Sequence, residues 1–254
     1  MLLKDKVAVV YGAGGPIGGA IARHFAAAGA LVQLAGRTEA KLRAVAGEIG
    51  AGGGRARTAV VDALDERAVE DLVDRLVAET GRLDVSVNVI GLGDVQKPLR
   101  ELTLQQFLQP ITTAMQTQFI TTSAAARHMT ARGGGVILCF GGNGPQTLPG
   151  LGGFKIALDA MEGLRRQWAC ELGEHGIRVL TMRTGGIPET LPQDFPGRDE
   201  IIAGLVEPTL LKRTATLSDV GNVATFLASD LAASITSTEI NISCGAIPDG
   251  AIPD

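Results

Sequence analysis

The alternation of short apolar runs with longer stretches of helical period is the feature that most constrains the fold. Uninterrupted runs of Val, Ile and Leu are typical of parallel strands, because crossover helices bury both faces of the sheet. Segments of helical period separate these runs. The sequence therefore predicts a doubly wound α/β fold, with a parallel sheet of about seven strands and helices on both faces. The predicted strands are 6–11, 30–35, 55–61, 83–90, 135–140, 177–182 and 238–243.

A single domain is expected over residues 1–254, because the length suits one such sheet and no linker or long internal repeat interrupts it. The net charge of −4 is spread along the chain, which argues against a nucleic-acid partner. The uncharged stretch 133–154 is too rich in glycine and proline for a membrane helix. Separated cysteines among apolar neighbours indicate buried thiols in a reducing cytoplasm, and no metal site is expected.

The segment VVYGAGGPIGGAIA, residues 9–22, joins the first predicted strand to the first predicted helix. A glycine-rich turn at this position lets the backbone approach a pyrophosphate, and the helix start offers N–H groups and a positive dipole end. A loop that is merely rich in glycine is the plainer alternative. The strand before the turn and the helix after it favour a dinucleotide site instead.

This turn resembles the T-G-x-x-x-G-x-G motif of the short-chain dehydrogenase/reductase family. Gly12 and Gly18 match the motif. Tyr11 stands where threonine is usual, and Pro16 replaces the middle glycine. Proline suits the first position of a helix, but it removes one N–H from a phosphate cradle. The resemblance extends over nearly the whole chain and implies a Rossmann-like fold that binds a nicotinamide dinucleotide.

Further segments carry the resemblance and imply a set of cofactor contacts. NVIG (88–91) stands where the family has N-N-A-G, and IRVLTMRTGGIPET (177–190) resembles the family's nicotinamide loop, with Thr184 in place of a proline. INISCGA (240–246) resembles the family's last strand. The cofactor-binding residues implied are Gly12, Gly14, Ile17, Gly18, Arg37, Asp62, Asn88, Gly91, Lys155, Gly185 and Ile187.

The second predicted strand ends in LAGRTEAKL, which bears on the choice between NADP and NAD. Sites that prefer NAD usually place a carboxylate here for the ribose hydroxyls, whereas an arginine accommodates the extra phosphate of NADP. The carboxylate is absent and Arg37 is present, so NADP(H) is expected to be preferred over NAD(H). The alternative is that Arg37 is a solvated residue before a helix capped by Thr38.

Family members usually rely on a tyrosine, a serine, a lysine and an asparagine for proton transfer. KIALDAMEGL resembles the family's lysine helix, so the resemblance implies that Lys155 is the catalytic lysine, which also holds the nicotinamide ribose. The tyrosine position, four residues earlier, is Leu151. The serine position is Gly141 or Gly142, and the asparagine position is Ala114. Three of the four usual roles are therefore vacant.

No change of alignment restores the missing tyrosine, because the only tyrosine of the chain is Tyr11, in the cofactor turn. Asn143, Gln146 and Thr147 are expected near the vacated site, where they would orient substrate or water but are poor acids. Arg183 is a candidate for holding an anionic substrate, with a packed or rim arginine as the alternative.

Two functions stay open. The first is an NADP(H)-dependent oxidoreductase with an atypical active site. It would transfer hydride to or from a small, mostly apolar substrate, such as an imine, enone or carbonyl, bounded by the variable segment 186–213. The second is a non-catalytic dinucleotide-binding protein, a pseudoenzyme or regulatory subunit. If the protein is an oxidoreductase, Lys155 is expected to anchor the cofactor. The alternative role for Lys155 is that of a solvated charge on an amphipathic helix.

The helix that carries Lys155 also bears on assembly, because apolar residues recur along it at helical spacing. Relatives in the family pair this helix and its neighbour across a dimer interface, so the resemblance implies a homodimer or homotetramer. The apolar stripe consists of Phe154, Leu158, Met161, Leu164, Trp168 and Leu172.

Overall fold

The described residues, 1–141 and 147–246 of the computed structural model, form one seven-stranded sheet in the order β3-β2-β1-β4-β5-β6-β7. Every neighbouring pair of strands is parallel, which confirms the predicted Rossmann-like fold. The strands are β1 (Val7–Tyr11), β2 (Leu31–Gly36), β3 (Arg55–Val60), β4 (Val85–Asn88), β5 (Gly135–Phe140), β6 (Ile177–Thr184) and β7 (Glu239–Ile242).

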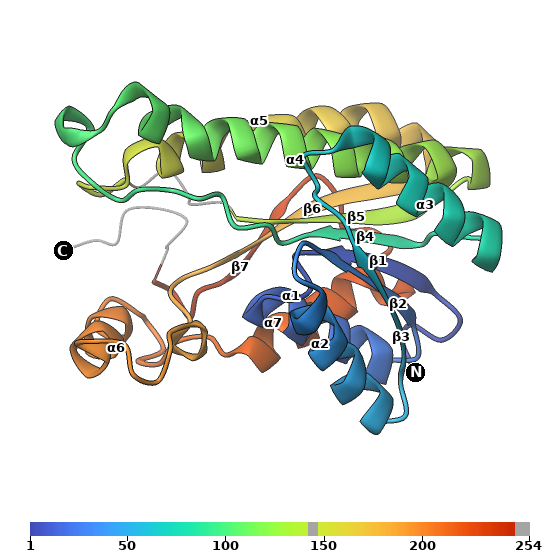
Figure 1. Cartoon of the computed structure of the whole chain (residues 1–254), viewed down its shortest axis with the longest axis horizontal. Helices are drawn as coiled ribbons and strands as arrows, with labels where there is room; N and C mark the ends of the chain where they lie inside the picture. The colour runs from blue at the N-terminus through green and yellow to red at the C-terminus, as the bar shows by residue number, and fades with distance from the viewer. Residues whose placement is uncertain (142–146, 247–254) are drawn as a thin grey trace.

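Helices cover the sheet on both faces (Figure 1). One layer holds α3, α4 and α5, and the other holds α1, α2 and α7, while α6 lies apart from both layers. The helices are α1 (Pro16–Ala27), α2 (Glu39–Ala51), α3 (Glu66–Thr80), α4 (Leu104–Arg132), α5 (Gly152–Leu172), α6 (Arg198–Val206) and α7 (Leu217–Ala228). Short 3₁₀ turns are η1 (Leu99–Glu101), η2 (Gly173–His175), η3 (Pro188–Thr190) and η4 (Asp230–Ala232).

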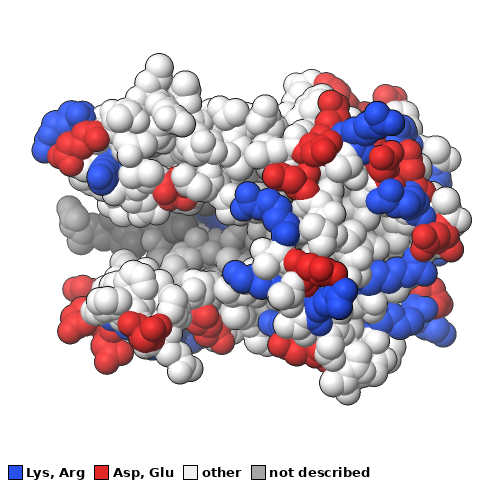
Figure 2. All heavy atoms as spheres, in the orientation of Figure 1, with Lys and Arg blue, Asp and Glu red and all other residues white. Residues whose placement is uncertain are grey.

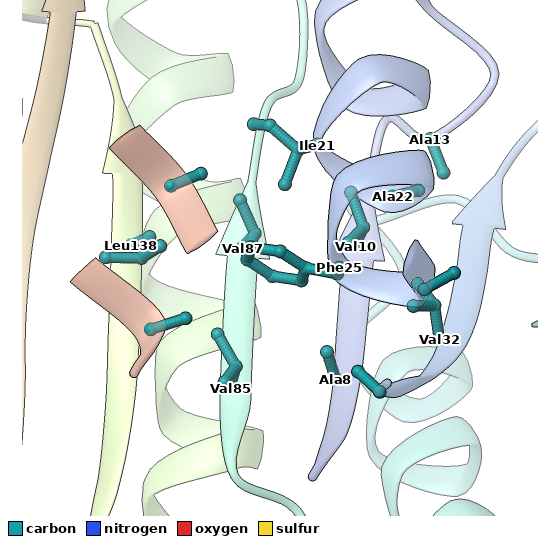
Figure 3. Close-up of a cluster of buried hydrophobic side chains, with 14 of the residues drawn as sticks. Ala8, Val10, Ala13, Ile21, Ala22, Phe25, Val32, Val85, Val87 and Leu138 are labelled. Atoms are coloured by element: carbon teal, nitrogen blue, oxygen red, sulfur yellow. The ribbon is translucent and has the colours of Figure 1, made fainter. Parts of the chain in front are cut away.

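An apolar core lies on each side of the sheet, as the continuous Val and Leu runs require. On the α1 side, Phe25 is fully buried and its ring lies among side chains of β1 and β4, including Val10 and Val87 (Figure 3). On the α4 side, Val9 and Met129 belong to a second cluster. Burial on both faces explains why β1 and β5 read as continuous apolar runs, whereas the edge strand β3 is largely exposed and mixes charged with apolar residues.

The strand registers place five residues in one row across the sheet, and this row runs through the last residues of β1 and β4. Tyr11 pairs with Asn88, Asn88 with Cys139, Cys139 with Thr181, and Thr181 with Glu239. Parallel strands send their following loops to the same edge, where ligands bind in open α/β sheets. This edge is therefore the place to look for a functional site.

The visible surface carries charged side chains of both signs (Figure 2). Figure 2 shows acidic and basic side chains interspersed on one face of the molecule, without a stripe of a single sign. Over residues 1–141 and 147–246, no helix has the length and apolar character needed to cross a membrane.

Candidate functional site

A cavity of about 370 Å³ opens at the carboxyl edge of the sheet, within the size range of small-molecule sites. Five of the predicted cofactor residues line it together: Gly12, Gly14, Arg37, Asp62 and Gly91. The segments that contribute them follow β1, β2, β3 and β4. Parallel pairing of these four strands thus assembles residues that are far apart in the sequence.

The turn after β1 depends on glycine at two positions. Gly12 has a φ of +80°, and a Cβ there would lie 2.2 Å from the carbonyl oxygen of Val89. A Cβ on Gly18 would lie 2.4 Å from the carbonyl oxygen of Gly12. The turn therefore packs backbone against backbone, and α1 begins directly after it at Pro16, the first helical position. The early N–H groups of a helix lack intrahelical acceptors, which suits an anionic ligand.

The start of α2 gives the cavity a cationic wall. Arg37 and Lys41 both line the cavity and are exposed. Neither forms an ion pair with any residue in the described ranges. Lys41 was not predicted from the sequence, although its position four residues after Arg37, one helical turn along, was a usable signal. Thr38 is the N-cap of α2 as expected, but its side chain makes no capping hydrogen bond.

The opposite wall, on α4, is polar and uncharged. Gln109, Thr113 and Thr117 line the cavity at four-residue spacing, so they share one face of the helix. The Gln109 amide donates to Thr113 Oγ1 over 2.9 Å, and the Thr117 hydroxyl donates to the Thr113 carbonyl over 2.8 Å. This wall was not predicted from the sequence, because the spacing of polar residues in FLQPITTAMQTQF indicates one helix face but not what that face contacts.

Asn88 supports the loop after β4 rather than lining the cavity. Its side-chain amide donates to Thr121 Oγ1 over 3.0 Å, and its Oδ1 accepts from the Ile90 N–H over 3.2 Å. The Thr121 hydroxyl donates in turn to the Thr117 carbonyl. These bonds fix the loop that carries Gly91. Five other predicted cofactor residues also lie outside the cavity lining: Ile17, Gly18, Lys155, Gly185 and Ile187.

Lys155 lies in the first turns of α5, also outside the cavity lining. It is 8% exposed, and its Nζ forms an ion pair with Asp159, one turn along the helix. The alternative of a solvated charge therefore does not describe its surroundings. Of the neighbouring substrate candidates, Thr147 is exposed, whereas Asn143 and Gln146 lie outside the described residues, as does Gly142, one of the two serine positions of the resemblance.

The positions that the resemblance assigns to serine and asparagine meet an apolar cluster. Ala114 is fully buried and packs with Leu158 and Met161. Gly141 faces the same side chains, since a Cβ there would lie 3.0 Å from Leu158 Cδ2 and 3.1 Å from Met161 Cε. Its φ of +135° also disfavours any other residue. Ala114 and Gly141 therefore offer packing surface at these two positions in place of hydroxyl and amide groups.

The first turn of α5 is closed against the start of α4. A Cβ on Gly153 would lie 2.1 Å from the Phe107 carbonyl oxygen, and one on Gly152 would lie 2.8 Å from Leu102 Cδ1. Leu151, the tyrosine position of the resemblance, is the half-buried N-cap of this helix. The glycines of LGGF thus allow two helices to meet at backbone distance.

Arg183 belongs to a buried charged cluster between α5 and the β6–β7 edge. Its Nη1 lies 3.2 Å from Glu239 Oε2, and its side chain is 5% exposed, which corresponds to the packed alternative. Glu162 forms an ion pair with Arg165 and accepts a hydrogen bond from Thr181. Burial and the nearby Glu162 charge raise the pKa of Glu239, while Arg183 opposes that shift. The charge of Arg183 is therefore already offset within the fold.

Cys139 lies beside this cluster, and burial raises the pKa of its thiol to about 12. A neutral thiol is a poor nucleophile and a poor metal ligand. Within residues 1–141 and 147–246, no three His, Cys, Asp or Glu side chains gather as a metal site would require.

Comparison with known proteins adds a family match. A family model described as enoyl-(acyl carrier protein) reductase matches residues 12–246. The D-threitol dehydrogenase of Mycolicibacterium smegmatis is 30% identical over 255 residues, covering 96% of this chain and 93% of that protein. An oxidoreductase of Mycobacterium tuberculosis, whose name assigns no substrate, is 31% identical over 245 residues and covers 96% and 92% of the two chains.

Solved structures agree with the sequence matches. A short-chain type dehydrogenase/reductase from Mycobacterium ulcerans superposes with a TM-score of 0.87 at 27% identity, covering 97% of this chain and 91% of that one. A 7α-hydroxysteroid dehydrogenase, solved with NADH and 7-oxo glycochenodeoxycholic acid, gives a TM-score of 0.87 at 28% identity, with 96% and 94% covered.

Proposed function

Because the chain belongs to the short-chain dehydrogenase/reductase family, whose members use nicotinamide dinucleotides, we propose that it is an NADP(H)-dependent oxidoreductase with an atypical active site. Its substrate is small and mostly apolar. The observation that carries the proposal is the cavity in which the glycine turn meets two exposed cations, Arg37 and Lys41. These groups fit a dinucleotide with an additional phosphate.

Each end of the cavity has a role in binding. The turn at Gly12 and Gly14 brings backbone close to the pyrophosphate, and the start of α1 favours its negative charge. Arg37 and Lys41 hold the phosphate on the ribose, and Asp62 lies toward the adenine. Lys155, outside the cavity lining, contacts the nicotinamide ribose. A bound nicotinamide supplies or accepts the hydride.

The residues at the reacting end select substrates that need little help from a protein acid. Loss of a general acid typically costs about 10²–10⁴ in rate. An iminium ion already carries its proton, and a conjugated enone takes a proton at carbon from water. The apolar cluster of Ala114, Leu158 and Met161 suits the uncharged body of such a substrate. Imines and enones are therefore better substrates than unactivated ketones.

Segment 186–213 bounds the substrate side. It holds η3 and α6, and α6 lies beyond the carboxyl end of β6 in Figure 1. Phe195, Leu210 and Leu211 leave much of their apolar side chains exposed on it. Exposed apolar side chains next to a cofactor cleft favour an apolar ligand.

A homodimer or homotetramer formed through α4 and α5 completes the proposal. Phe119 on α4 is 49% exposed and its ring lies 5.7 Å from that of Trp168 on α5, while Ile156 is 45% exposed. Within the apolar stripe, Leu158, Met161 and Leu172 are buried in the chain's own core. The outer aromatic and aliphatic side chains are the ones a second copy would cover. Light scattering that reports a monomer would contradict this assembly.

Calorimetric titration with NADPH and NADH tests the cofactor assignment. Wild-type protein binds NADPH more tightly, and Arg37→Gln lowers the NADPH affinity by about 10–100-fold with little effect on NADH. Arg43→Gln is the matched control, because Arg43 is an exposed α2 arginine that pairs with Glu39 outside the cavity. Equal NADPH affinity in wild type and Arg37→Gln would contradict the proposed preference for NADP(H) over NAD(H). Binding without oxidation of NADPH by any imine, enone or ketone would favour the non-catalytic alternative.

A further inference from the structure

The cavity suits one part of the proposed cofactor. Its lining holds the exposed cations Arg37 and Lys41, which fit a phosphate on the ribose. The residues proposed for the nicotinamide end, Lys155, Gly185 and Ile187, lie outside that lining. The cavity is therefore matched to the adenosine part of the dinucleotide. Polar side chains that line it away from the two cations are candidates for contacts with the base.

Gln109 belongs to the α4 wall of the cavity, and unlike Thr113 and Thr117 it is exposed. Its amide nitrogen donates to Thr113 Oγ1 over 2.9 Å. Its Cγ lies 3.8 Å from the position that a Cβ on Gly93 would take, so the side chain also meets the loop after β4. A long side chain that is already held in place loses less rotamer entropy when a ligand binds. Gln109 is thus prepared for contact with a ligand.

The amide group of Gln109 keeps one donor and one acceptor. A glutamine amide has two N–H donors and a carbonyl oxygen, and Thr113 takes one of the donors. Within residues 1–141 and 147–246, neither the second N–H nor Oε1 has a hydrogen-bond partner. These two groups lie side by side on one edge of the planar amide. A ligand that pairs with this edge must itself place a donor beside an acceptor.

Asp62 lines the same cavity and contributes a charged acceptor. Its Oδ1 accepts the N–H of Leu64 over 3.1 Å, which orients the carboxylate. Together the side chains of Asp62 and Gln109 present two acceptors and one donor. An amine with two hydrogens beside a ring nitrogen complements this set, and adenine has that arrangement at N6 and N7. Guanine has a carbonyl oxygen where adenine has the amine, so it lacks the donor.

We propose that Gln109 is a specificity residue that accepts a hydrogen bond from the N6 amine of the cofactor's adenine and donates one to N7. Glutamine pairs with the same edge of adenine in DNA, where such a pair changes the preference between bases by about 5–150-fold. Asp62 accepts the other N6 hydrogen, and Thr113 is a positioning residue that orients the amide. This inference rests on the proposed function, because it takes the ligand to be the NADP(H) cofactor.

Calorimetric titration with NADPH and with its hypoxanthine analogue tests this role. The analogue differs from NADPH at the base alone, where a carbonyl oxygen replaces the N6 amine. Wild-type protein is expected to bind NADPH more tightly. Gln109→Leu should lower the affinity for NADPH by about 5–50-fold and leave that for the analogue unchanged or higher, because the analogue already lacks the matching donor. Thr113→Val should narrow the ratio of the two affinities by about 2–5-fold, since the amide remains without its orienting bond.

Gln116→Leu is the matched control. Gln116 is exposed on the same helix and does not line the cavity, so this variant should bind both ligands as the wild type does. An equal loss of affinity for NADPH and for the analogue in Gln109→Leu would overturn the inference, because it would indicate a contact with a part that the two ligands share. An unchanged NADPH affinity in that variant would overturn it as well.

The outcomes separate this inference from the proposed function. Wild-type protein that binds NADPH and the analogue equally well overturns the reading of the base by Gln109, while cofactor binding stands. Wild-type protein that binds neither ligand overturns both. If Gln109→Leu fails to fold, Thr113→Val decides the question, and a ratio of affinities equal to that of the wild type overturns the inference.

Discussion

The two ends of the proposed site differ in the kind of residue that they present. At the cofactor end, the fold supplies a glycine turn at Gly12 and exposed cations at Arg37 and Lys41 around one cavity. At the reacting end, Ala114 and Gly141 meet an apolar cluster where relatives of the family have polar side chains. Nucleotide binding depends mainly on backbone shape and distributed charge. Proton transfer depends on single side chains, so a few substitutions suffice to remove it.

The largest effect on stability and on cofactor binding is expected from a substitution in the turn after β1. Gly12→Ala is expected to cost about 3–5 kcal/mol of stability and to abolish NADPH binding, because the φ of +80° is strained for alanine and the Cβ would overlap the Val89 carbonyl. Gly50→Ala is the control, since its Cβ meets nothing within 4 Å in the exposed part of α2. It should leave binding unchanged and stabilise by about 0.4–1 kcal/mol. Urea unfolding and calorimetry measure both quantities, and tight NADPH binding by Gly12→Ala would refute the account of the turn.

A second variant tests whether the reacting end is a packed core. Ala114→Asn restores the family's usual side chain, but it is expected to lower the free energy of unfolding by about 2–3 kcal/mol, since it buries an amide among Leu158 and Met161. NADPH affinity should stay within about twofold of wild type. Gln116→Asn, on an exposed position of the same helix, is the control and should cost less than about 0.5 kcal/mol. An Ala114→Asn protein of wild-type stability would show that polar space exists there.

A smaller effect appears in alkaline solution and concerns Tyr11. Burial raises its pKa in the folded protein, whereas the unfolded chain releases the phenolic proton from about pH 10 upward. The contribution of this phenol to the free energy of unfolding is therefore fully present below about pH 10. It falls above that pH by up to about 1.4 kcal/mol per pH unit. The Tyr11→Phe variant has no phenol, so its free energy of unfolding should decline less steeply above about pH 10. Urea midpoints at pH 9, 10 and about 11 measure it, and identical slopes for both proteins would contradict a neutral buried phenol.

The fold was predictable from the sequence because strands that are buried on both faces, such as β1 and β5, read as apolar runs between segments of helical period. The run GVILCF, for example, predicts 135–140, which is the extent of β5. Strand ends were less predictable: β6 runs to Thr184, two residues beyond the predicted 182, because it continues to pair with β7. The strand that pairs with these residues is distant in the sequence, so a local apolar pattern does not indicate it.

The site residues were predictable where a sequence motif determines the backbone shape. They were less predictable where residues that are distant in the sequence come together only in the folded protein. Gly12, Arg37 and Asp62 were identified from the sequence and line one cavity. Lys41 and the α4 wall were missed, because only the arrangement of helices around the sheet shows which of their faces meets the turn. Glu162 has the spacing of a solvated helix charge, yet it is buried with Arg165 against β6. A hydropathy pattern does not show that a charged residue is buried in an ion pair of this kind.

The measurement that tests the central claim most directly is a matched substrate comparison under single-turnover conditions. Protein loaded with NADPH is mixed with a cyclic iminium ion or with the ketone of the same carbon skeleton, and NADPH oxidation is followed by absorbance. An intact cofactor end without a protein acid predicts that the iminium ion is reduced at least about 100-fold faster than the ketone. A ketone reduced as fast as the iminium ion would contradict the account, because it would require a proton donor at the reacting end.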